Sequence, residues 1–110
     1  MNAYGIEMTE FLLKYVRAKP GMYLTSPKLL YLHIFLTGYS IACWQNLPER
    51  EDRFFNHFQD WFFQRIKARK GNVWYAEILE EVQHSEEKAL DRFWEYLEEF
   101  DRETGGKATS

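Results

Sequence analysis

The fold is decided by residues 26–45, which read SPKLLYLHIFLTGYSIACWQ. Ser26 is a favourable N-cap and Pro27 suits the first helical position, so we expect a helix that begins here and ends near Gln45. Apolar side chains cover most of its circumference, which predicts that this helix is central in the core. Gly38 lowers helix stability by about 1 kcal/mol relative to alanine, so another element should approach closely there. The polar residues of this helix form one narrow stripe, made of His33, Thr37 and Ser40.

Amphipathic patterns predict four further helices on the two sides of this segment. We expect them at about residues 7–18, 52–69 and 73–83, and from the N-cap Ser85 onward. No stretch alternates apolar and polar residues for long enough to predict a strand. The sequence therefore predicts an all-α fold of about five helices around a central apolar helix.

The length of 110 residues fits one domain, which at this size buries roughly two-thirds of its unfolded surface. Aromatic residues make up 18% of the chain, so Phe, Tyr and Trp side chains should dominate the core. From Thr104 onward the residues are small or polar, which is typical of a frayed end. We predict a single helical domain at residues 1–103 and a flexible tail at residues 104–110.

The chain carries few signals for a membrane or an oxidising compartment. The most apolar run, Leu29 to Trp44, is shorter than the ~20 residues that a membrane span requires. The first residues lack the basic and apolar regions of a signal peptide. Cys43 is the single cysteine, which excludes an intrachain disulfide and fits a reducing compartment. We therefore expect a cytoplasmic protein with no membrane contact.

Charge is distributed unevenly along the chain. Residues 1–75 contain ten Lys and Arg against six Asp and Glu, a net charge of +4. Residues 76–110 contain four Lys and Arg against eleven Asp and Glu, a net charge of −7. The C-terminal third therefore presents a strongly anionic surface.

Candidate catalytic and metal-binding residues are few. Cys43 lies in the most apolar segment, where a thiol is normally inert, and His33 points in another direction on the same helix. Glu81 and His84 have the spacing used in di-iron bundles, but such a site needs that motif twice and two further glutamates. A solvated surface explains them better, so we expect no enzymatic activity, metal or cofactor.

A short basic cluster supplies the alternative function, a small nucleic-acid-binding regulatory protein. Basic side chains followed by aromatic ones can combine phosphate contact with base stacking. The acidic C-terminal third argues against this function because it would repel a polyanion. The residues concerned are Arg65, Lys67, Arg69, Lys70, Trp74 and Tyr75.

Motifs along the chain resemble those of small bacterial immunity proteins from polymorphic-toxin and contact-dependent growth inhibition systems. The likeness covers most of residues 8–101, with Lys19 where arginine is more usual. It implies a protein that binds and neutralises a cognate toxin domain, and it carries over no catalytic residues. The motifs are Arg17 to Tyr23, Gly38-Tyr39, Phe58 to Trp61, Trp74, and Phe93 to Phe100.

The acidic third is the predicted toxin-binding surface. Many such toxins are nucleases with basic phosphate-holding sites, so an acidic helical face would attract and cover them. An exposed aromatic residue, Phe63 or Tyr96, is expected to anchor the contact. The same carboxylates would also keep the domain soluble, and the toxin's identity and the oligomeric state stay open. The predicted carboxylates are Glu77, Glu80, Glu81, Glu87, Asp91, Glu95 and Glu98.

Overall fold

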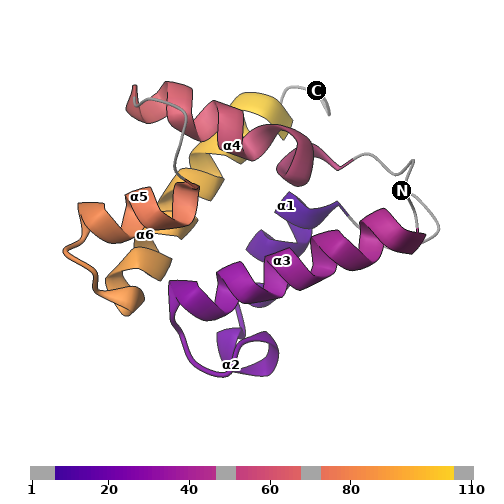
Figure 1. Cartoon of the computed structure of the whole chain (residues 1–110), viewed down its shortest axis with the longest axis horizontal. Helices are drawn as coiled ribbons and strands as arrows, with labels where there is room; N and C mark the ends of the chain where they lie inside the picture. Colours follow the sequence, from indigo (N-terminus) through magenta and orange to yellow (C-terminus); the bar gives the residue numbers. More distant parts are fainter. Residues whose placement is uncertain (1–6, 47–51, 68–72, 106–110) are drawn as a thin grey trace.

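The computed structural model describes residues 7–46, 52–67 and 73–105, and within these ranges the chain forms helices and no strand (Figure 1). The radius of gyration, 13.8 Å, is that of one compact domain of this length. The predicted all-α class is therefore confirmed. The helices are α1 (Met8–Phe11), η1 (Leu12–Val16), α2 (Pro20–Tyr23), α3 (Leu29–Asn46), α4 (Arg53–Ile66), α5 (Trp74–Glu81), α6 (Glu86–Phe100) and η2 (Asp101–Gly105).

The first helical segment widens from α1 into η1 without a break. The side chain of Glu7 accepts a hydrogen bond from the Thr9 N–H at 2.9 Å, which caps the start of α1. In η1 the Arg17 N–H donates to the carbonyl of Leu12, five residues earlier, at 2.9 Å. This is the wider hydrogen-bond spacing of a π-turn.

The start of α3 differs from the prediction. The helix begins at Leu29 rather than beside Ser26, and the Leu30 N–H in its first turn donates to Oε1 of Glu86 at 2.8 Å. The first N–H groups of a helix need acceptors outside the helix. Glu86 of α6 supplies one of these acceptors from a distant part of the chain, so the predicted cap at Ser26 is wrong.

Helix α3 is also less buried than its composition predicts. Leu29, Leu32 and Leu36 are buried, but Ile34 and Ile41 are 55% and 52% exposed. A side chain at Gly38 would meet no neighbouring atom within 4 Å, so no element approaches closely there. The predictions of all-round burial and of a close contact at Gly38 are therefore wrong.

Helix α6 holds the larger share of the core. It packs against α3, α4, α5 and η1. The ring of Phe58 in α4 meets Phe93 and Phe100 of α6 edge to face, with centroids 5.7 and 5.3 Å apart. The predicted dominance of aromatic packing is confirmed. The buried residues of α6 are Ala89, Leu90, Phe93, Tyr96, Leu97 and Phe100.

Asp52 joins the start of α4 to the start of α1. Its Oδ1 accepts the Phe54 N–H at 3.0 Å, and its Oδ2 accepts the Met8 N–H at 2.9 Å. Helix α4 ends at Ile66 because Lys67 takes a left-handed conformation, with φ 57°. The predicted start near residue 52 is confirmed, and the helix ends earlier than the predicted residue 69.

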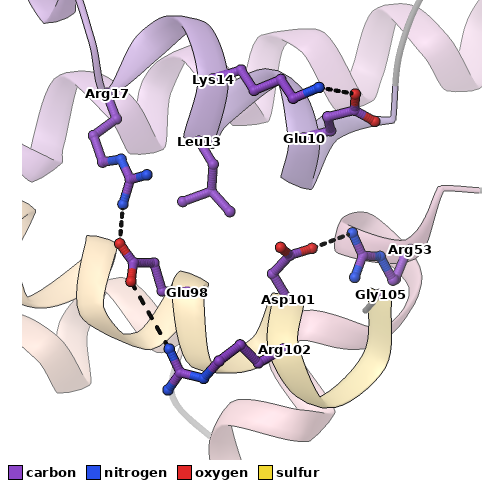
Figure 2. A pocket seen from close by; sticks show the side chains of 9 residues that line it. All are labelled: Glu10, Leu13, Lys14, Arg17, Arg53, Glu98, Asp101, Arg102 and Gly105. Carbon is purple, nitrogen blue, oxygen red and sulfur yellow. Dashed lines mark hydrogen bonds and ion pairs between the residues drawn. The ribbon is translucent and has the colours of Figure 1, made fainter. Parts of the chain in front are cut away.

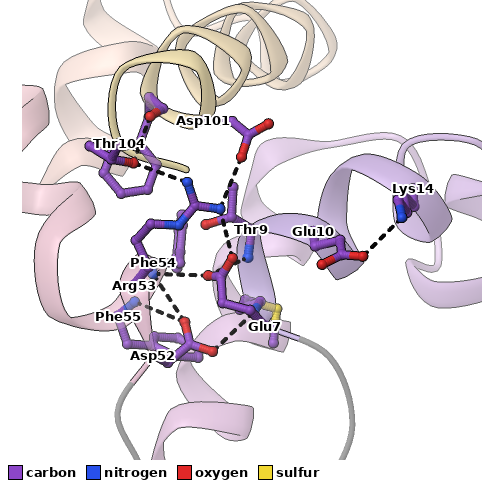
Figure 3. A network of polar contacts seen from close by, with 12 residues as sticks. Glu7, Thr9, Glu10, Lys14, Asp52, Arg53, Phe54, Phe55, Asp101 and Thr104 are labelled. Carbon is purple, nitrogen blue, oxygen red and sulfur yellow. Dashed lines mark hydrogen bonds and ion pairs between the residues drawn. The ribbon is translucent and has the colours of Figure 1, made fainter. Parts of the chain in front are cut away.

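Arg53 connects three helical segments (Figure 3). Its Nη2 donates to Oε1 of Glu7 at 2.8 Å and to Oδ1 of Asp101 at 2.9 Å, and its Nη1 donates to Oγ1 of Thr104 at 3.0 Å. Thr104 therefore belongs to the folded domain, and η2 continues to Gly105. The predicted tail starts too early, while residues 106–110 lie outside the described ranges.

Helices α5 and α6 are joined by a tight turn at residues 82–85. Ser85 caps α6, as predicted, by accepting the Lys88 N–H. Gln83 and His84 precede it with φ values of 54° and 65°. Two consecutive left-handed residues that are not glycine make this a strained connection.

Candidate partner-binding surface

The carboxylates predicted from the sequence point outward from α5 and α6. Glu77 is half-buried, and the other six are exposed. Their position on two connected helices follows from the turn at residues 82–85, which folds α6 back against α5 (Figure 1). Their role in partner binding stays a prediction.

Arg92 compensates two of these carboxylates. Its Nε contacts Glu81 at 2.5 Å and its Nη1 contacts Glu95 at 2.6 Å. Burial lowers the pKa of Arg92, but the hydrogen bonds to Glu81 and Glu95 outweigh burial and raise it. Glu81 also accepts the Tyr96 hydroxyl at 2.8 Å. Glu81 and Glu95 are therefore occupied inside the molecule.

Glu98 is compensated from another side. It forms an ion pair with Arg17 of the first helical segment and lies 3.9 Å from Arg102. The neighbouring Glu99 pairs with Arg65 of α4. The C-terminal half of the acidic row thus joins helices together rather than standing free.

Three of the four remaining predicted carboxylates flank the α5–α6 turn. Within the part of the chain that the structure describes, Glu80, Glu87 and Asp91 take part in no ion pair. Glu86 accepts hydrogen bonds from the Tyr75 hydroxyl at 2.7 Å and from the Leu30 N–H at 2.8 Å, and both donors are uncharged. Its negative charge is therefore not neutralised by these bonds. We call this group, Glu80, Glu86, Glu87 and Asp91, the acidic tip.

The two predicted aromatic anchors are buried. Phe63 is 3% exposed and Tyr96 is 2% exposed. Helix α4 buries the adjacent phenylalanines Phe62 and Phe63, so its buried face is wide enough to include Phe63. The ring of Tyr96 packs edge to face on Phe62, with centroids 5.0 Å apart. The prediction that either residue is an exposed anchor is wrong.

An apolar surface on α3 was missed by sequence reasoning. Leu30, Ile34 and Ile41 are exposed at helical spacing on one side of the helix. Beside them lies a groove of about 230 Å³ between α3 and the starts of α4 and α5, which we call the α3–α5 groove. The polar stripe of α3 was the available signal, because His33, Thr37 and Ser40 line this groove.

A larger cleft of about 660 Å³ lies between the first helical segment and the end of α6 (Figure 2). Four cationic side chains and three carboxylates line it, together with Leu13 and Gly105. Lys14 contacts Glu10 at 2.8 Å, and Arg53 contacts Asp101 at 2.9 Å. Glu98 lies between the two remaining arginines, as described above. Two of these ion pairs, Arg17 with Glu98 and Arg53 with Asp101, join different helical segments, and the other two lie within one segment, so the cleft presents little net charge.

The basic segment of the alternative function is only partly described. Arg65 pairs with Glu99, while Arg69 and Lys70 lie outside the described residues. Trp74 is only 8% exposed, and the ring of Tyr75 stacks on His33 with centroids 4.8 Å apart. These two aromatic side chains are therefore not presented for base stacking.

The catalytic and metal candidates are Cys43 and the pair Glu81 and His84. Cys43 is half-buried on α3, and Glu81 is bound to Arg92 and Tyr96 rather than paired with His84. Among the described residues, no three His, Cys, Asp or Glu side chains are placed to hold a metal ion together. Nor is any described helix long and apolar enough to cross a membrane.

Comparisons with protein-family models, with curated proteins and with solved structures found no match.

Proposed function

We propose that this protein is an immunity protein that binds a cognate toxin domain in the cytoplasm and neutralises it one to one. The observation that carries the proposal is the acidic tip. Its carboxylates have no cationic partner among the described residues, whereas Glu81, Glu95 and Glu98 do. The motif resemblance in Arg17 to Tyr23 and in the later helices supports the same function.

Charge complementarity explains how such a surface would inhibit a toxin. A nuclease concentrates Lys and Arg where it holds phosphate, and unpaired carboxylates attract that surface and accelerate association. A carboxylate that is already paired must first lose its partner, so the acidic tip should contribute more than the rest of the row. The tightly packed aromatic core keeps the helices in place, which lowers the ordering cost of binding.

Co-expression tests this proposal. The probe is the variable C-terminal domain of a large secreted protein encoded beside this gene, and the wild-type chain should restore growth of cells that express it. Glu87→Lys and Asp91→Lys should each weaken binding about tenfold, mainly through slower association that salt reduces. Glu10→Lys makes the same change in charge at an exposed carboxylate of α1, and it should keep near wild-type affinity.

Two outcomes count against the proposal. If the wild-type chain does not protect against that domain, the immunity function is rejected. If Glu87→Lys and Asp91→Lys fold and protect fully, the acidic tip is not the binding surface. Tight, salt-sensitive binding to nonspecific DNA or RNA would instead favour the regulatory alternative.

A further inference from the structure

The α3–α5 groove is an apolar groove that shares no residue with the acidic tip. Leu36, Phe54, Phe55 and Trp74 contribute to its lining, and Ile41, which is 52% exposed, also borders it. Small-molecule sites usually measure about 300–1,000 Å³. At about 230 Å³ the groove is better matched to one protein side chain than to a cofactor.

The groove lies close to Glu86, a carboxylate of the acidic tip that has no cationic partner among the described residues. His33 in its lining stacks on Tyr75, with ring centroids 4.8 Å apart, and the Tyr75 hydroxyl donates to Glu86 at 2.7 Å. One aromatic ring therefore separates the groove wall from a carboxylate of the acidic tip. The Leu30 N–H binds the same carboxylate, which places the apolar side of α3 beside the tip as well.

Of the described helices that border the groove, α3 and α5 contain neither lysine nor arginine, and Arg53 at the start of α4 is already bonded to Glu7 and Asp101. Helix α3 contains no charged residue along its 18 residues. Helix α5 contains three glutamates and neither lysine nor arginine. A segment that enters the groove between these helices is thus favoured if it is cationic, by charge complementarity.

We propose that the α3–α5 groove receives one large apolar side chain of the toxin, carried on a cationic segment whose Lys or Arg residues contact the acidic tip. This inference rests on the proposed function and identifies the anchor that Phe63 and Tyr96 do not provide. Binding energy concentrates where an apolar anchor fills a desolvated pocket beside polar contacts. The groove supplies the pocket, and the tip supplies the polar contacts.

Two variants test the groove with the same toxin domain. Ser40→Phe fills the groove from inside, and Ile41→Ser removes an exposed apolar side chain from its border. Each should weaken toxin binding by at least about tenfold, measured by calorimetry. Met22→Ser removes an apolar side chain that is 68% exposed on α2, outside the groove, and should change affinity less than about twofold. Urea unfolding shows whether each variant keeps wild-type stability.

A peptide probe separates failure of the groove from failure of the proposed function. We expect the peptide Lys-Lys-Phe-Lys-Lys to shift the NMR signals of His33, Ser40, Ile41 and Trp74 in the wild-type protein. Peptides with Ala in place of Phe, or with Glu in place of Lys, should do so at least about threefold less at equal concentration. In Ser40→Phe the shifts should be lost.

The two readouts give distinct conclusions. Peptide shifts without toxin binding would support the groove and reject the immunity function. Unchanged toxin affinity in both folded groove variants would overturn the inference while leaving the immunity function intact. Equal shifts with all three peptides would also overturn it, because neither the aromatic side chain nor the positive charge would then be recognised.

Discussion

Arg53 shows how much of this fold depends on one polar side chain. It is 21% exposed, and it bonds to Glu7, Asp101 and Thr104, which lie 46, 48 and 51 residues from it in the sequence. Its guanidinium carbon also lies 5.5 Å from the centre of the Phe100 ring. Burial raises the pKa of Glu7, but hydrogen bonds from Arg53 and Thr9 outweigh burial and leave it below its usual value. The network therefore favours the ionised carboxylate.

Arg53→Met should lower the free energy of unfolding by about 2 kcal/mol near neutral pH, because it leaves partly buried acceptors without their donor. Arg102→Met is the control, since Arg102 is 69% exposed and makes one contact of 3.9 Å with Glu98. That control should cost less than about 0.5 kcal/mol. Urea unfolding measures both, and equal effects would show that the Arg53 network contributes little.

The pH dependence of the Arg53 effect follows from Glu7. A carboxyl whose pKa is lowered in the fold stabilises it above the unfolded pKa, and that stabilisation is lost as pH falls through the folded pKa. The difference between wild type and Arg53→Met should therefore narrow below pH 4.5, the ordinary pKa of this group.

Tyr75 provides a second residue-scale prediction. Burial and the hydrogen bond to Glu86 raise its pKa from 10.0 to about 12. A raised folded pKa means that the stabilisation is complete below pH 10 and is lost as pH rises toward 12. Tyr75→Phe should thus cost about 1 kcal/mol at neutral pH, and its deficit should shrink in alkali.

Absorbance titration of tyrosinate provides the independent check on Tyr75. The phenylalanine variant should lack a late-titrating tyrosine that the wild type has. Tyr31→Phe is the control, because Tyr31 is also half-buried but its hydroxyl makes no hydrogen bond within the described residues, and it should cost less than about 0.5 kcal/mol at neutral pH. If the absorbance lost in Tyr75→Phe titrates near pH 10 instead of near 12, the assignment is contradicted.

At the scale of elements, local signals in the sequence predicted helices better than they predicted helix environments. The amphipathic pattern of residues 52–69 and the cap at Ser85 gave α4 and α6 close to their observed starts. The start of α3 was missed because its first turn is bonded to Glu86, 56 residues away from Leu30. Sequence rules that consider only neighbouring residues cannot predict a contact between residues so far apart.

The strained backbone of the turn between α5 and α6 leads to a prediction about stability. His84 has φ 65°, a conformation that costs a side-chain-bearing residue roughly 1–2 kcal/mol and costs glycine little. His84→Gly should therefore stabilise the protein by about 0.5–1 kcal/mol. His57→Gly makes the same exchange at an exposed position inside α4 and should destabilise by a similar amount.

Thermal or urea unfolding of the two glycine variants tests this prediction, because the free energy of unfolding should rise in His84→Gly and fall in His57→Gly. A loss of stability in His84→Gly would mean that the histidine side chain contributes more than its backbone conformation costs.

At the scale of the whole molecule, the uneven charge along the chain was visible in the sequence, but its pairing was not. Of the predicted acidic surface, Glu81, Glu95 and Glu98 bind arginines from α6, the first helical segment and η2. Among the described residues, the predicted carboxylates that make no ion pair, Glu80, Glu87 and Asp91, lie on either side of the α5–α6 turn. Composition gives total charge, whereas the effective field depends on which charges the fold brings together.

The exposed apolar face of α3 could not be predicted for a related reason. An apolar helix is read as buried because burial is the usual outcome, and the sequence of α3 gives no sign of which flank lacks a neighbour. The three-dimensional arrangement leaves Ile34 and Ile41 uncovered and opens the groove beside them.

The carboxylate of Glu86 holds two helices in place and still has positions at which it can accept further hydrogen bonds. A carboxylate offers about four lone-pair positions, and Leu30 and Tyr75 use one oxygen each. An incoming guanidinium can bond to the unused positions while both existing donors stay attached. A partner could therefore bind to Glu86 without breaking the hydrogen bond that holds the start of α3. The helices would keep their arrangement as such a complex forms and dissociates.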